Sequence, residues 1–174
     1  MSDQALHLPS VDRGAGARDA EHRRLVLQRI QPALIGLIDG TISTLAPIFA
    51  AAYLAGSHAA LLVGLASALG AAISMGLSEG LSDDGSVTGR GSSLSRGVIT
   101  GGATFFGGTF HALPFLIGDV STALAVAYVV VAIELVVIAL VRRRFMAVPL
   151  PVSLVQVTMG GVMVAAVGIV VGHA

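Results

Sequence analysis

Two acidic residues stand inside apolar stretches that are long enough to span a bilayer. Asp39 lies in ALIGLIDGTISTLAPIFAAAYL and Glu79 in LVGLASALGAAISMGLSEGL, each within a Gly-Leu-x-acid-Gly frame. A carboxylate in hydrocarbon is costly, so it is retained where it faces a bundle interior, a partner or an ion route. These two positions are therefore the first candidates for function.

Other polar side chains lie close to Glu79 in the sequence. Met75 precedes it by one helical turn, and Asp83 continues the same stripe at i+4 if the helix persists. Asp83 and Asp84 stand at the mouth of the apolar stretch, where they either collect cations or cap and end the helix. The sequence leaves both roles open.

A third acid, Glu134, lies within the apolar run VVVAIELVVIALV. Two roles fit it: a proton relay, or a structural hydrogen bond to Thr100 or Thr104. His111 is likewise either a satisfied hydrogen-bonding residue or a metal contact on the exit side.

The residue types point to a divalent first-row metal. Carboxylate oxygens suit Mg, Ca and Mn, and a thioether adds preference for softer ions, so Asp39, Met75 and Glu79 together favour Fe(II) or Mn(II). Carboxylates release protons when they bind a metal, so metal and protons compete for one site. Such competition is the minimum that proton-coupled exchange requires. Proton relay and structural hydrogen bonding remain alternatives, and the absence of cysteine excludes thiolate sites.

The elements that must position these residues are membrane helices. The chain is 55% hydrophobic and 11% charged, with mean hydropathy +0.88, which is typical of an integral membrane protein. Apolar segments near 33–54, 59–81, 97–118, 121–141 and 152–172 each have the length that a helix needs to cross a bilayer. The sequence thus predicts an all-α fold, with a polar leader over 1–31 and a five-span transporter domain over 32–174.

The positions of arginine predict the orientation. All ten basic residues are arginines. With five spans and a cytoplasmic N-terminus, every arginine falls in a cytoplasmic segment, as the positive-inside rule requires, and the C-terminus lies outside. Within the leader, the first half is expected to be disordered, and Arg18–Ile30 forms either an amphipathic surface helix or a solvated basic lead-in.

Two motifs resemble a known family. IGLIDGTIST in the first span and GAAISMGLSEGLS in the second are similar to the vacuolar iron transporter family, whose spans carry Asp-Gly with Ser/Thr and Ser-Met-x-x-x-Glu. QPALIGLIDGTISTLAPIFAAA, SEGLSDDGSVTGRG and Ala-Ile-Glu-Leu resemble more narrowly the membrane half of membrane-bound ferritin, the erythrin and vacuolar iron transport fusion. The likeness covers about residues 30 to 172.

The resemblance implies a five-span homodimer that exports Fe(II), and Mn(II) as a further cargo, in exchange for protons. It places Asp39, Met75 and Glu79 on a route at the dimer interface, where two-fold symmetry doubles each ligand. The metal is cargo, so no permanently bound cofactor is expected. The expected setting is the bacterial inner membrane, with metal ions, protons, lipid and a ferritin-like protein as partners and no nucleic acid.

Two departures leave an alternative open. The loop SDDGSVTGRGSSLSR is too short for the cytoplasmic metal-binding domain of the vacuolar transporters, and the leader has no Glu-x-x-His pairs for a di-iron domain. The chain is therefore either a bare transporter core or a non-transporting assembly subunit that docks a ferritin-like partner. An enzyme is not expected, because the further aspartates of phosphatidyl-transferases and the Gly-x-Ser pattern of rhomboid proteases are missing.

Overall fold

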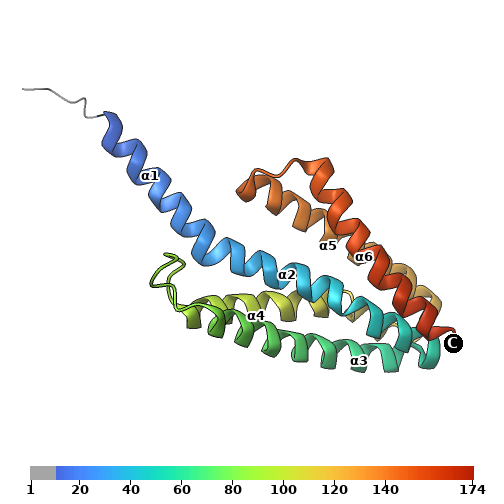
Figure 1. The fold of residues 1–174 in the computed structure, drawn as a ribbon. Coiled ribbons are helices and arrows are strands. Elements are labelled where there is room, and N and C mark those ends of the chain that lie inside the picture. Colours follow the sequence, from blue (N-terminus) through green and yellow to red (C-terminus); the bar gives the residue numbers. More distant parts are fainter. Residues whose placement is uncertain (1–10) are drawn as a thin grey trace, which may run out of the picture.

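The computed structural model describes the backbone of residues 11–174, and all regular structure in that range is helical (Figure 1). The predicted disorder at the extreme N-terminus lies largely outside the described residues. The elements in chain order are α1 (Val11–Leu25), the π-helix η1 (Val26–Ile30), α2 (Gln31–Ser43), α3 (Leu45–Ser82), α4 (Ser93–Phe110), the 3-10 helix η2 (Leu113–Leu116), α5 (Val120–Met146) and α6 (Leu150–Gly172).

Helix α1 runs into α2 through a widened turn. The π-helical turn η1 ends just before Pro32, and Gln31 N–H donates to the carbonyl of Val26. Proline has no N–H and disrupts regular helical hydrogen bonding around it, which accounts for the widening. The described side chains of α1 are exposed, and the helix projects beyond one end of the bundle (Figure 1). The leader is therefore helical where it is described.

Three helical stretches are long and apolar enough to cross a membrane: Gly16–Ser82, Val120–Met146 and Leu150–Gly172. The first reverses direction at Gly56, whose φ of 82° breaks the helix inside α3. Ile48 and Gly64, on opposite sides of this break, pack against each other. The chain therefore forms a helical hairpin whose turn is centred on a single glycine.

The expected span over 97–118 is not one helix. Helix α4 ends at Phe110, and η2 follows after His111 and Ala112. Eight of the eighteen residues of α4, SLSRGVITGGATFFGGTF, are Gly or Thr, and Arg96 adds a charge, so the helix is less apolar than its neighbours. The break after Phe110 also places His111 at a helix end.

Helix α4 lies between α2 and the second half of α3. A Cβ on Gly36 would lie 2.1 Å from the Thr100 carbonyl oxygen of α4. On its other side, a Cβ on Gly97 would lie 2.6 Å from the carbonyl oxygen of Gly76 in α3. Glycine at these positions therefore allows the helices to pack with their backbones in close contact.

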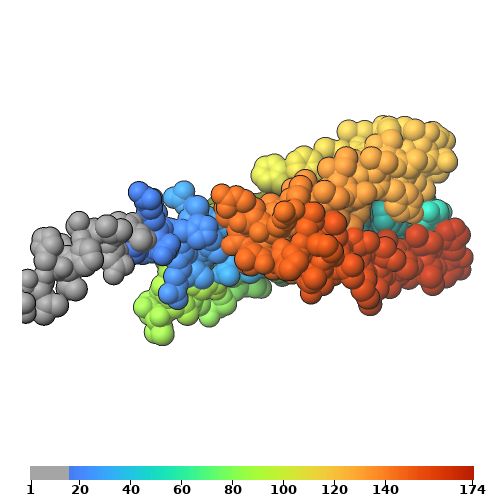
Figure 2. Space-filling model, turned by 90° about the horizontal axis from the view of Figure 1, so that it is seen from above, coloured from blue at the N-terminus to red at the C-terminus, as the bar shows by residue number. Residues whose placement is uncertain are grey.

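Helices α5 and α6 form an antiparallel pair on the other side of α2 (Figure 1). A Cβ on Gly168 of α6 would lie 2.5 Å from the Ala46 carbonyl oxygen, so α6 packs closely along the first part of α3. Figure 2 shows α6 in red and the end of α5 in orange covering one face of the molecule. Large apolar side chains on the outside, such as Leu62, Val129 and Val162, are more than half exposed, as lipid-facing residues would be.

The glycine contacts give a stability prediction. Gly36→Ala should lower the free energy of unfolding by about 1–3 kcal/mol, because the added methyl group meets backbone that cannot move aside cheaply. Gly102→Ala is the matched control on α4, since its Cβ would meet nothing within 4 Å. Thermal unfolding of purified protein in detergent measures both. Equal midpoints for the two variants would contradict the packing argument.

Candidate metal site and ion-pair clusters

Asp39 lies on the outward side of α2. It is half-buried and belongs to a stripe with Ile35, one turn before, and Ser43, one turn after, both of which are exposed. The adjacent residue Gly40 faces α4 instead, where its Cβ would lie 2.1 Å from the Thr104 carbonyl oxygen. Helix α2 thus holds Asp39 next to the α4 contact without burying it in that contact.

Glu79 lies near the end of α3 and is engaged by two arginines. Arg90 Nη2 donates to Glu79 Oε1 at 2.7 Å, and Arg96 Nε donates to the same oxygen at 2.8 Å. The Arg96 side chain is completely buried and also donates to the carbonyls of Gly91 and Asp83. A buried guanidinium group needs these carboxylate and carbonyl acceptors, because an unpaired buried charge is costly.

The same arginines reach the carboxylate of Asp83. Its Oδ2 lies 3.7 Å from Arg96 Nη2 and 4.0 Å from Arg90 Nη1. Two arginines and two carboxylates therefore form a cluster, which we call the inner cluster: Glu79, Asp83, Arg90 and Arg96. Its formal charges cancel, so Glu79 is not a free metal ligand in this arrangement.

Asp83 and Asp84 shape the loop after α3. The helix ends at Ser82, and Asp83 adopts extended backbone, so the predicted stripe from Met75 does not continue to Asp83. Asp83 Oδ1 accepts a hydrogen bond from Gly85 N at 2.7 Å, and Asp84 Oδ1 accepts one from Ser86 N at 2.8 Å. Of the two roles that the sequence left open, the structure supports the one in which these aspartates end the helix.

Hydrogen bonds hold both of these carboxylates in the ionised form. The Thr88 hydroxyl and the Gly85 N–H lower the pKa of Asp83, and hydrogen bonds from Ser86 lower the pKa of Asp84. Both side chains remain negative at neutral pH.

The predicted ligands are not brought together within one protomer. Asp39 lies beside the part of α4 near Thr104, whereas Glu79 meets Arg96, about two helical turns or 12 Å further along α4. Met75 lies one turn from Glu79 on the same helix and is half-buried. Among the described residues, no group of three His, Asp or Glu side chains is placed to hold one metal ion.

Glu134 has a partner that the sequence did not indicate. Its Oε2 lies 2.9 Å from Nδ1 of His111, and Nε2 of His111 lies 2.8 Å from the Thr44 hydroxyl. The predicted bond from Glu134 to Thr100 or Thr104 is wrong, because Oε2 meets His111 and Oε1 has no partner among the described residues, while the two threonines bond to backbone carbonyls. The buried histidine is therefore a hydrogen-bonding residue.

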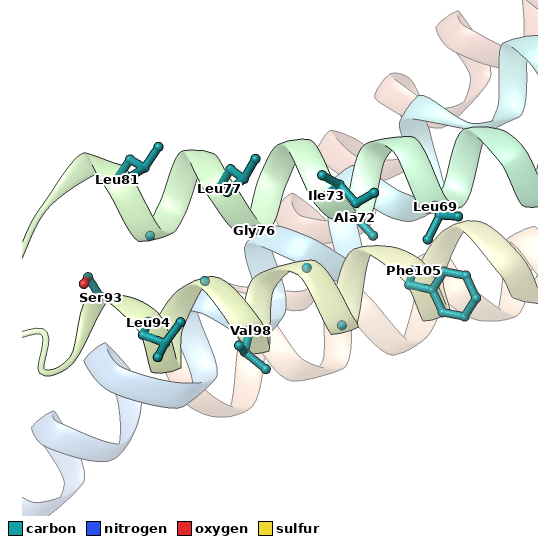
Figure 3. Close-up of a pocket in the computed structure, with 14 residues that line it drawn as sticks. Leu69, Ala72, Ile73, Gly76, Leu77, Leu81, Ser93, Leu94, Val98 and Phe105 are labelled. Carbon is teal, nitrogen blue, oxygen red and sulfur yellow. The ribbon is translucent and has the colours of Figure 1, made fainter.

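An apolar groove on the surface has no side chains that bind metal ions. It lies between α3 and α4, holds about 660 Å³, and is lined by apolar side chains with a single serine (Figure 3). Leu69, Ile73 and Leu77 project from α3, and Val98 and Phe105 from α4. Because no carboxylate, imidazole or thioether lines this groove, it is not the predicted ion route.

The fold and the clusters define an all-helical protein with helices of membrane-spanning length and paired buried charges. Comparisons with family models, with curated proteins and with solved structures gave no match. The family resemblance therefore rests on the two sequence motifs alone.

In the sequence, Arg90 and Arg96 indicate only the orientation of the spans. Their spacing from Glu79 gave no signal of pairing, because the contact depends on a loop that turns back on α3 at glycines with positive φ, including Gly85 and Gly91. The His111–Glu134 pair joins residues 23 positions apart on different helices. A search of the sequence for a basic residue to pair with each acid in a membrane helix would have pointed to both of these pairings.

The burial of the two arginines predicts different energetic roles. Arg96→Gln should destabilise the protein by about 3–5 kcal/mol, because it leaves buried carboxylates without their cation. Arg90→Gln should cost about 1 kcal/mol or less, because the Arg90 side chain is 21% exposed and its pair is screened by solvent. Chemical unfolding in detergent measures both. Adding Glu79→Gln to the Arg96 variant should recover part of the loss, and a further loss would contradict the pairing.

The lowered pKa of Asp83 predicts a pH effect on the loop. A carboxylate whose pKa is lowered in the folded state stabilises the folded protein at pH values above its ordinary pKa of 3.8. This contribution is lost as the pH falls through the lower pKa of the folded state. Between about pH 6 and about pH 3, the thermal midpoint should therefore fall less in Asp83→Asn than in the unmodified protein. Parallel curves for the two proteins would show that Asp83 makes no such contribution.

Proposed function

We propose that this chain exports Fe(II) or Mn(II) from the cytoplasm in exchange for protons. The observation that carries the proposal is the state of Asp39. Of the three acids within apolar helices, Glu79 pairs with arginines and Glu134 with His111, whereas no basic side chain among the described residues pairs with Asp39. A half-buried carboxylate in a membrane helix that lacks a cation of its own is suited to bind one that passes.

The proposed topology has five spans. The first is α2 with the part of α3 before Gly56, and the second is the rest of α3; α4 with η2, α5 and α6 supply the others. Arg142 donates to Gln156 and lies with Gln31 around one pocket, while the Thr100 hydroxyl near Arg96 reaches Pro32. The arginines of α4 and α5 therefore gather at the end of the bundle where α2 begins, which we assign to the cytoplasm.

A second copy of the chain would complete the proposed metal route. Asp39 is on the outward side of α2, so two-fold pairing along the Ile35–Asp39–Ser43 stripe would bring two such carboxylates together. Met75 would add a thioether, which favours Fe(II) and Mn(II) over Mg. Glu79 would join the ligand set only after a metal ion displaces its arginines, so the inner cluster would act as a competitor at the cytoplasmic mouth.

Metal flux into proteoliposomes tests this function. The purified full chain should move Fe(II) or Mn(II) under an imposed pH gradient, and Asp39→Asn should abolish the flux because the amide loses the charge that attracts the ion. Met75→Ala should reduce it, whereas Met159→Ala, which changes an exposed methionine of α6, should leave it unchanged. Reconstitution of each variant is checked by protein content and size.

The opposite result is equally informative. If the folded and reconstituted protein moves neither metal, the transport proposal fails for this chain. Binding of a ferritin-like protein by the same proteoliposomes would then favour the assembly-subunit alternative.

A further inference from the structure

Thr44, His111 and Glu134 form a hydrogen-bonded chain at the meeting point of four helices. Thr44 lies at the break between α2 and α3, His111 caps the end of α4, and Glu134 lies within α5. The three residues are 1%, 0% and 8% exposed, respectively. Glu134 also lines an apolar pocket with Leu37 and Ile133, so its surroundings have few polar groups.

The hydrogen-bond geometry constrains the protons of this chain. The Thr44 hydroxyl donates its only proton to the Gly40 carbonyl at 2.8 Å, so His111 Nε2 must donate to Thr44 Oγ1. His111 Nδ1 and Glu134 Oε2, 2.9 Å apart, then share one proton. The pair is neutral overall whichever of these two atoms holds that proton.

The carboxyl group of Glu134 is incompletely satisfied. Its Oε1 is buried and accepts no hydrogen bond from any described residue. A permanent structural ion pair normally fills such positions with donors, because a buried unpaired oxygen costs free energy. The Glu134 carboxyl group is held by a single hydrogen bond, the one between Oε2 and His111. A proton can therefore leave or return to this group without breaking a larger network.

No other titratable group is hydrogen-bonded to the pair. Helix η2 contains none. Tyr53 and Tyr128 contact each other through their hydroxyls at 3.1 Å, and Glu79 binds arginines. The titratable or charged residues on these elements are Asp39 on α2, Tyr53, His58 and Glu79 on α3, Arg96 on α4, and Tyr128, Arg142, Arg143 and Arg144 on α5. Asp39 is linked to the pair through its neighbour Gly40, whose carbonyl accepts a hydrogen bond from Thr44, and Thr44 in turn contacts His111.

We propose that the His111–Glu134 pair is the proton-binding site of the exchange. The inference rests on the proposed function, with Asp39 as the metal-binding residue. When a cation binds at Asp39, the shared proton leaves the Nδ1–Oε2 hydrogen bond for water, and the pair changes from neutral to singly negative. When the cation departs, a proton returns to the same bond. Thr44 is the positioning residue, because it orients the imidazole and joins it to the Asp39–Gly40 turn.

Infrared spectroscopy tests the site without requiring transport. A pH-induced difference spectrum of the full chain in detergent should contain carboxyl and imidazole bands that disappear in Glu134→Gln. His111→Gln should shift the remaining carboxyl band, and Thr44→Val should move its titration without removing it. Asp119→Asn, which changes an exposed carboxylate at the start of α5, is the matched control and should retain these bands. Identical spectra for Glu134→Gln and the unmodified protein would overturn the proposal.

A flux experiment separates this proposal from the proposed function. In proteoliposomes, Glu134→Gln should still move Mn(II) down its own gradient, but an imposed pH gradient should no longer change the rate. Glu134→Asp, which keeps the carboxyl group, should restore the response to pH. If Glu134→Gln remains fully coupled, the proton site is elsewhere although transport stands. If the unmodified protein transports nothing while the infrared bands titrate, the proposed function fails and the titrating pair remains. If Glu134→Gln does not fold, the His111→Gln and Thr44→Val spectra decide the outcome.

Discussion

Backbone contact at glycine holds α4 between two helices, and both charged clusters depend on it. At Gly36 and Gly97 there is no room for a side chain, so the axes of α2, α4 and α3 approach closely. Helix α4 bears Arg96 near its beginning and His111 at its end, and each meets a carboxylate on another helix. A wider separation would move both basic groups out of hydrogen-bonding distance and leave Glu79 and Glu134 unpaired in an apolar setting.

This arrangement divides the acids of the bundle into two kinds. Glu79 and Glu134 are compensated by basic side chains, so their cost of burial is reduced. Asp39 has no such partner among the described residues and faces outward from the α4 contact. All three acids lie within comparably apolar sequence, so whether an acid is paired depends on its position on the helices. Compensation therefore distinguishes structural charges from the charge that remains available to a ligand.

The helices were predictable because the length of an apolar segment is a local property of the chain. The end of α4 at Phe110 was not predictable, because it depends on the packing of His111 against Thr44 and Glu134. The arginine contacts of Glu79 were missed for the same reason: a loop with left-handed glycines, which sequence spacing does not describe, folds them back onto α3.

The reversal at Gly56 has a consequence for how the molecule assembles. Residues such as Ile48 and Gly64 come into contact across a turn of minimal length, so the entropy lost in closing this hairpin is small. The contacts of α4 with α2, such as the bond from Thr100 to Pro32, join residues 68 positions apart and close a much longer segment. The hairpin is thus a unit of local order that can form during synthesis, before α4 has emerged to pack beside it.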